Sequence, residues 1–199
     1  SAESYVYDVT NGNITQKIQW GQVLATDDGS FTDTGNDKFT TNYTHANSVE
    51  GVSKISSQKI IDQSAATVKE KKYYYDNLVF GGITNGNLTK QEDLKSSGLY
   101  ITSQKIYNSF GLVSSDIDPL GKVTSYTYDT YNLYPVTITN PLLHTLQYAY
   151  DYALGQVIRK TDENSRVFEY NYDGLGRLTQ ENQPDIASPS TLVAKILYA

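Results

Sequence analysis

The 199-residue sequence predicts an all-β protein made of antiparallel hairpins. A Tyr-x-Tyr-Asp motif recurs at intervals of 22 residues, and its copies are Tyr126–Asp129, Tyr148–Asp151 and Tyr170–Asp173. A second turn signal lies midway between the copies, and it begins at Asp118, Asn140 and Asp162. A turn signal therefore returns every 11 residues, which leaves room for one strand of about five or six residues and one turn. A helix does not fit between such closely spaced breakers, and a fixed period is typical of a repeat architecture.

The region 105–199 is predicted to consist of these regular 22-residue repeats. The tyrosines of each motif occupy alternate strand positions, so both rings of a pair are expected on one face of the sheet. These repeat-strand residues are Tyr126, Tyr128, Tyr148, Tyr150, Tyr170 and Tyr172.

The turns combine an acceptor side chain with a residue that tolerates positive φ. An Asp carboxylate is expected to accept hydrogen bonds from backbone N–H groups two or three residues ahead, and Gly supplies the positive φ. The predicted repeat-turn residues are Asp8, Asp76, Asp118, Gly121, Asp129, Asp151, Gly155, Asp173 and Gly176. Residues 118–121 match a type I turn with Pro at its second position. Residues 140–143 lack the glycine, so a more open turn is expected there.

The region 1–104 is predicted to contain irregular copies of the same unit with longer loops. Tyr5–Asp8 and Tyr73–Asp76 each end in the motif and are followed by Asn-Gly at 11–12 and 85–86. Asn-Gly between strand-like runs is a strong hairpin signal. Both termini lie next to strand-like sequence, and the chain is expected to be one continuous sheet from a longer polypeptide.

The composition limits the classes of function that are expected for this chain. The sequence has eighteen tyrosines, five phenylalanines and one tryptophan, a bias that suits a sheet whose faces are partly exposed to solvent. A net charge of −6 without a basic cluster argues against nucleic-acid binding. No apolar run reaches about 18 residues, so no membrane span is predicted. The absence of cysteine excludes a disulfide framework.

No catalytic, cofactor or metal residues are predicted. His45 and His144 lack the spacing of metal ligands, and no Gly-x-Ser-x-Gly elbow is present. The strongest calcium candidate is an oxygen-rich cluster, which lacks the regular spacing of a calcium loop. Its members are Asp27, Asp28, Asp33, Asn36 and Asp37.

The motifs resemble those of the RHS/YD-repeat family. Residues 170–179 follow the family pattern of Tyr-x-Tyr-Asp, a Leu-Gly turn and Arg-Leu-Thr, while 148–158 carries one extra residue and Gln156 in place of Arg. Residues 126–142 diverge after the motif and are most similar to the repeats of the B and C components of bacterial insecticidal toxin complexes. The resemblance is strong over about 105–185, fair at 1–20 and 70–92, and thin between these ranges.

The resemblance implies a β-sheet ribbon that curls into a hollow shell around a toxic polypeptide. It implies a non-enzymatic structural segment of a secreted or bacterial cell-surface protein, with the rest of the shell or the enclosed toxin as partner. The family's C-terminal core block is not found in this sequence, and Asp118-Pro119 fits the turn register rather than a cleavage site. The alternative is an extracellular adhesion module that recognises carbohydrate or a partner protein through a tyrosine-rich sheet face.

Overall fold

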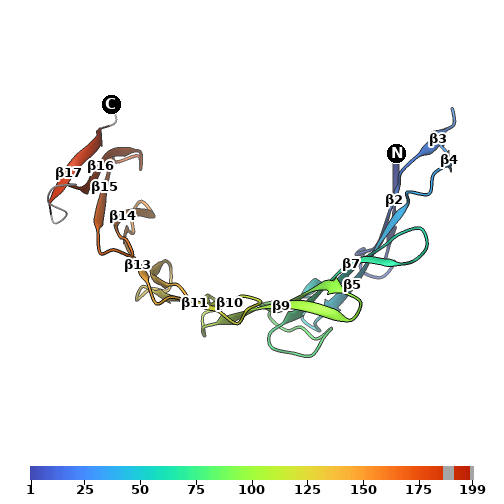
Figure 1. The fold of residues 1–199 in the computed structure, drawn as a ribbon, viewed down its shortest axis with the longest axis horizontal. Helices are drawn as coiled ribbons and strands as arrows, with labels where there is room; N and C mark the ends of the chain where they lie inside the picture. The colour runs from blue at the N-terminus through green and yellow to red at the C-terminus, as the bar shows by residue number, and fades with distance from the viewer. Residues whose placement is uncertain (186–190, 198–199) are drawn as a thin grey trace. The chain divides into compact units, whose positions relative to one another are not determined.

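The computed structural model describes residues 1–185 and 191–197, with side chains up to 193. The described residues form strands joined by turns and bends, and none of them lies in a helix (Figure 1). Fifteen strands form one sheet in the order β1-β2-β5-β6 and then sequentially to β17, while β3 and β4 pair separately. Every recorded pairing is antiparallel, so the predicted all-β antiparallel fold is confirmed.

The chain divides into two compact units, Ser1–Lys105 and Ile106–Ala199. The strands that begin in the first unit are β1 (Ala2–Tyr7), β2 (Ile14–Trp20), β3 (Val23–Ala25), β4 (Phe31–Asp33), β5 (Phe39–Asn47), β6 (Ser53–Ile61), β7 (Thr67–Tyr75), β8 (Leu88–Ser96) and β9 (Leu99–Tyr107). The strands of the second unit are β10 (Val113–Ile117), β11 (Val123–Tyr128), β12 (Pro135–Thr139), β13 (Thr145–Asp151), β14 (Gln156–Thr161), β15 (Val167–Tyr172), β16 (Leu178–Pro184) and β17 (Leu192–Leu197).

The first unit contains a small core at the base of a long loop. Ala46, Tyr75 and Ile83 are buried there, and Val52, Tyr73 and Leu88 pack around them. The connection between β2 and β5 carries the separate β3–β4 hairpin. Phe31 of this hairpin meets Trp20 edge-on at 5.5 Å between ring centroids.

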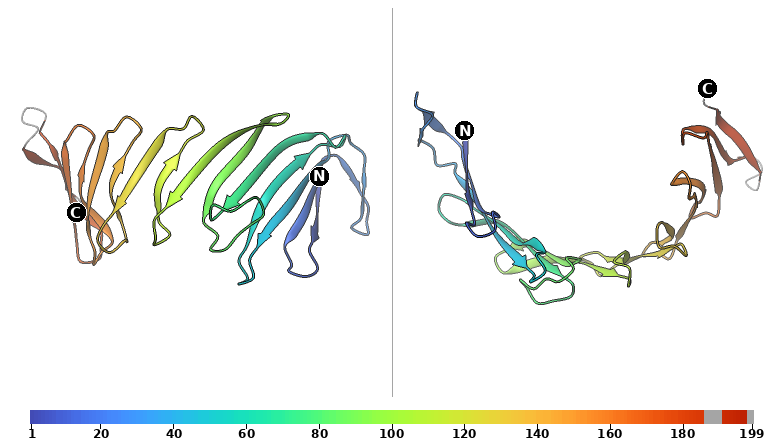
Figure 2. Two further views of the ribbon diagram at one scale, coloured as in Figure 1. Left: turned by 90° about the horizontal axis from the view of Figure 1, so that it is seen from below. Right: turned by 180° about the vertical axis from the view of Figure 1, so that it is seen from behind.

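The second unit has no comparable core. Among its described residues, Asp129 alone is buried, and the apolar side chains are half-buried or exposed. Its strands lie side by side in chain order, and successive turns lie alternately at the two ends of the strands (Figure 2, left). Because little apolar surface is removed from water here, hydrogen bonds and turn geometry carry more of the stability than in a layered domain.

Candidate functional site

The recurring element of the second unit is a turn that an Asp or Asn side chain organises. At Asp173, the carboxylate Oδ1 accepts from the backbone N–H of Leu175 at 2.9 Å and of Arg177 at 3.0 Å. The Asp173 N–H donates to the Arg177 carbonyl, and the Gly176 N–H donates to the Asp173 carbonyl, both at 2.9 Å. The side chain thus bonds the N–H groups two and four residues ahead, rather than two or three.

The same four bonds recur with little change along the chain. They are made by the turns that begin at Asp62, Asn108, Asp118, Asn140, Asp162 and Asp173. The residue three positions after the acceptor has positive φ each time, and these residues are Ala65, Gly111, Gly121, Leu143, Ser165 and Gly176. A type I turn followed by such a left-handed residue is a common three-residue hairpin connection.

The expectation of a more open turn at 140–143 is wrong. The Leu143 N–H donates to the Asn140 carbonyl at 2.9 Å, as in the glycine-containing turns. Leu143 itself adopts a φ of 66° to make this possible. The hydrogen bonds of the acceptor side chain therefore impose the turn even where the local backbone preference opposes it.

Other predicted turn residues use related but different bonds. Asp8 accepts from the Thr10 N–H at 2.8 Å and the Thr10 hydroxyl. Asp151 accepts from residues two and three ahead, and its carbonyl accepts from the Gly155 N–H at 2.8 Å. Asp76 instead reaches across its long loop to the N–H groups of Thr84, Gly86 and Asn87, at 2.8 to 2.9 Å.

The carboxyl groups of these turns have lowered pKa values. For Asp173, the backbone N–H of Arg177, then its guanidinium, lowers the pKa. For Asp129 and Asp76, burial would raise the pKa, but hydrogen bonds outweigh it and the net pKa is lowered. These bonds come from backbone N–H groups in both turns and, at Asp129, also from the Tyr152 side chain. All three therefore stay ionised at neutral pH, the form that accepts hydrogen bonds most strongly.

The second tyrosine of each motif bonds the backbone 15 residues earlier. The hydroxyls of Tyr128, Tyr150 and Tyr172 donate to the carbonyls of Val113, Pro135 and Val157, at 2.9, 3.1 and 2.8 Å. These carbonyls lie at or next to the first residue of the preceding even-numbered strand. Each hydroxyl therefore links the end of one strand to the start of the strand paired with it.

A register shift accompanies each of these tyrosines. It falls at Thr127/Tyr128, Ala149/Tyr150 and Asn171/Tyr172, again at intervals of 22 residues. The first unit shows the same shift at Val6/Tyr7 and Tyr74/Tyr75. A β-bulge redirects a side chain and increases the local twist of a strand. The motif thus specifies a bulge, a hydroxyl–carbonyl bond and a turn in immediate succession.

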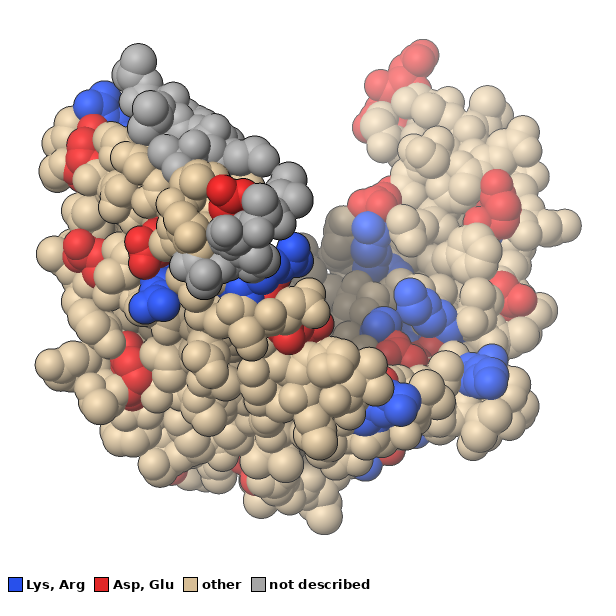
Figure 3. Space-filling view, turned by 60° about the vertical axis from the view of Figure 1, so that its left-hand side comes forward, with Lys and Arg blue, Asp and Glu red and all other residues tan. Residues whose placement is uncertain are grey.

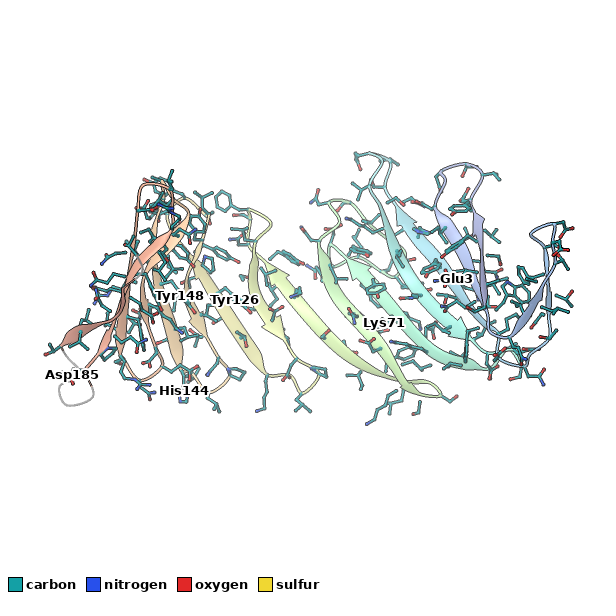
Figure 4. The ribbon with its side chains drawn as sticks, turned by 90° about the horizontal axis from the view of Figure 1, so that it is seen from above. Glu3, Lys71, Tyr126, His144, Tyr148 and Asp185 are labelled. Atoms are coloured by element: carbon teal, nitrogen blue, oxygen red, sulfur yellow. The ribbon has the colours of Figure 1, made fainter. Side chains whose placement is uncertain are left out.

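The first tyrosine of each motif remains on the sheet face. The Tyr126 hydroxyl donates to Asp116 Oδ2 at 3.0 Å, and the ring of Tyr148 lies 6.4 Å from that of Tyr150. Burial raises the pKa of Tyr126 and of Tyr170. Tyr126 and Tyr148 extend from strands of the second unit, whereas His144 lies at a turn (Figure 4).

The histidines and the acidic cluster are engaged in local contacts. His144 Nδ1 lies 3.5 Å from Glu163 Oε2, and His45 lies in β5 opposite Ile55. The hydroxyls of Thr26 and Ser30 and the Ser30 N–H lower the pKa of Asp28 to about 2. Both oxygens of Asp37 accept from the Gln22 N–H at 3.0 Å. Within 1–185 and 191–197, no three His, Cys, Asp or Glu residues are grouped as metal ligands.

Charged residues of both signs are interspersed on the face drawn in Figure 3. No helix in the described part of the chain is long and apolar enough to cross a membrane.

The family profile described as RHS Repeat matches residues 107–145 and 150–185. Residues 107–145 and 150–185 carry RHS repeats. The matched residues contain the three Tyr-x-Tyr-Asp motifs apart from Tyr148 and Ala149, so the predicted resemblance is confirmed. A comparison with curated proteins gives no match.

Solved toxin structures share the fold of these RHS repeats. A crystal structure of TcdB2-TccC3 aligns with a TM-score of 0.59 and 17% identity, and a TcdB2-TccC3-Cdc42 structure with 0.58 and 17%. Each alignment covers 89% of this chain and 9% of the solved chain. A Photorhabdus luminescens Tc holotoxin pore aligns with a TM-score of 0.56 and 18% identity, over 87% of this chain and 8% of that one. The chain therefore spans about a tenth of the length of these solved proteins and shares the fold of the part that it matches.

Sequence reasoning missed the bulges, the hydroxyl–carbonyl bonds and the turn at Asp62. The turn at Asp62 had only a partial signal, an Asp after a strand-like run, because Ala65 stands where other turns have Gly111, Gly121 or Gly176 and its positive φ is visible only in the structure. The bulges had none, since they depend on how two strands are paired.

Proposed function

We propose that these RHS repeats form part of the wall of a shell that encloses a toxin polypeptide, in a bacterial protein that is secreted or held at the cell surface. The role is mechanical and non-enzymatic. Its partners are the remainder of the shell and the enclosed polypeptide. Both regions, 1–104 and 105–199, contribute the same kind of unit to this wall.

The observation that carries the proposal is the hydroxyl–carbonyl bond repeated at Tyr128, Tyr150 and Tyr172. Each copy joins two strands that are already paired, β10 with β11, β12 with β13 or β14 with β15, and adds a side-chain bond to their backbone pairing. The same bond can be repeated along a sheet of any length, without a second layer. The predicted repeat-turn residues hold the turns of this sheet, and the repeat-strand residues hold its neighbouring strands together. A sheet that needs no covering layer leaves a face free to line an interior.

The test is a protease-protection assay on the complete gene product that contains these residues. The proposal expects one segment of that product, or a co-purified partner, to resist protease while the wall is intact. A variant that combines Tyr128→Ala, Tyr150→Ala and Tyr172→Ala should open the wall and expose that segment at an unchanged protease concentration. The single substitution Leu120→Ala, at an exposed turn position, serves as the control.

The proposal would be overturned by a gene product in which no segment is protected. It would also be overturned if protection were the same in the triple variant and in the native protein after circular dichroism had shown that the sheet was weakened.

A further inference from the structure

Two neighbouring turns of the second unit depart from the regular pattern, and both carry tyrosine. The turn at Asp129 is one residue longer, with the Asp129 N–H bonded to the carbonyl of Tyr134 five residues ahead. The turn at Asp151 bonds residues two and three ahead rather than two and four. In a repeat protein, a local departure from an otherwise consistent pattern is a place to look for function.

These two turns lie at the same end of the strands, because they follow β11 and β13, which run in the same direction in a sheet of alternating strands. The rings of Tyr131 and Tyr152 meet edge to face there, with centroids 5.4 Å apart and an interplanar angle of 81°. Tyr131 is 69% exposed and Tyr152 is 50% exposed, and Leu133, two residues after Tyr131 in the same turn, is 61% exposed. We call Tyr131, Leu133 and Tyr152 the tyrosine ridge.

The residues next to the tyrosine ridge are held in place by ring stacking and hydrogen bonds. Tyr134 stacks on Tyr150 at 4.6 Å with an interplanar angle of 15°, and the Tyr150 hydroxyl is fixed to a backbone carbonyl. Asp129 is 9% exposed and accepts from the N–H groups of Tyr131 and Leu133, at 3.0 and 2.9 Å. The backbone of both exposed residues that follow Asp129 is thus fixed, so little backbone freedom is lost when a ligand binds.

The size and charge of the ridge restrict its ligand. A stable protein interface covers roughly 800 Å² on each partner, whereas the ridge has three side chains. The recorded cation–π contacts involve Tyr5, Trp20, Tyr74 and Tyr100, all in the first unit. The Asp129 carboxylate lies beside the ridge and is hydrogen-bonded to the Tyr152 side chain, so its negative charge disfavours an anionic ligand.

We propose that the tyrosine ridge binds a neutral oligosaccharide, whose apolar ring faces pack on Tyr131 and Tyr152. An exposed tyrosine presents an apolar ring with a polar tip, which suits a ligand that alternates C–H faces and hydroxyls. The site is separate from Tyr128, Tyr150 and Tyr172, whose hydroxyls are bonded to the backbone. The Tyr152 hydroxyl is bonded to the Asp129 carboxylate, so Tyr152 offers its ring rather than its hydroxyl to the ligand.

The experiment follows the tyrosine ring signals of the ¹³C-labelled protein by NMR during titration with maltotriose, triacetylchitotriose and lacto-N-tetraose. Sialyllactose serves as an anionic comparison. The expected result is a selective shift of the Tyr131 and Tyr152 signals with at least one neutral probe, at dissociation constants of about 1 mM. Tyr131→Ala and Tyr152→Ala should each weaken binding about tenfold, while Tyr131→Phe keeps the ring and most of the affinity.

The matched control is Phe110→Ala. Phe110 is also 69% exposed, on a regular turn of the same unit, and has no recorded aromatic neighbour. Its loss should leave binding unchanged. The proposal is overturned if no neutral probe shifts the ridge signals of the native protein, if only sialyllactose does, or if Phe110→Ala weakens binding as much as the ridge substitutions.

Discussion

Replacing Leu143 by glycine is expected to stabilise the hairpin between β12 and β13. Leu143 has a φ of 66° and is 81% exposed, so its side chain contributes little packing. A non-glycine residue in the left-handed region costs roughly 1–2 kcal/mol. Glycine removes that cost but adds about 0.5–1 kcal/mol of unfolded-chain entropy. The difference is a net stabilisation of between about 0 and 1.5 kcal/mol, with a central value of about 0.7 kcal/mol.

Gly176→Ala is the matched reverse experiment. Gly176 occupies the same turn position with a φ of 77°, and no side chain lies near enough to clash seriously with an added Cβ. The same reasoning predicts a loss of the same size for this substitution. The two substitutions therefore test one physical term with opposite signs.

The assay is native-state hydrogen exchange of the amides in β12 and β13, or in β15 and β16 for Gly176→Ala. Local exchange is preferable to a global unfolding curve, because a chain with two compact units need not unfold in one step. Slower exchange in Leu143→Gly and faster exchange in Gly176→Ala are expected. Faster exchange in Leu143→Gly would refute the reasoning, since it would mean that the leucine side chain stabilises the turn.

Three further substitutions test other contacts. Tyr150→Phe removes the hydroxyl bonded to Pro135 and should cost about 1 kcal/mol, measured by urea unfolding; no change would show that water replaces the bond. Asp76 has a lowered pKa in the folded chain, so its stabilisation is complete above the unfolded value of about 3.9 and is lost as the pH falls through the lower folded value. Asp76→Asn should flatten that acid loss in melting curves between pH 2 and 7, and an identical acid profile would contradict the role. Gly21→Ala places a Cβ against the Asp37 carboxylate and should cost about 1–3 kcal/mol, with a change in tryptophan emission as its local signal.

The regular half of the fold was predictable because its signals are local. An Asp or Asn followed three residues later by Gly specifies a turn by chemistry that the sequence displays directly, as at Asp118 and Asp173. The 22-residue interval then fixes the strand between two turns. Leu143 shows the limit of this reasoning, because the hydrogen bonds of Asn140 override the backbone preference of the residue.

The structural features that the sequence did not predict depend on how the strands pair. The bulge at Tyr150 exists only relative to β14, and its hydroxyl reaches a carbonyl of β12 that precedes it by 15 residues. The tyrosine ridge likewise joins Tyr131 to Tyr152 across two turns. Neither relation has a sequence spacing that distinguishes it from chance, so a single sequence does not reveal it.

The most direct test of the wall is a cryo-electron microscopy map of the complete gene product. The account predicts that these strands lie in a single layer, with one sheet face toward an enclosed space that holds polypeptide density. A map in which both faces of the β10–β16 sheet are covered by other layers of protein, as in a sandwich, would contradict it.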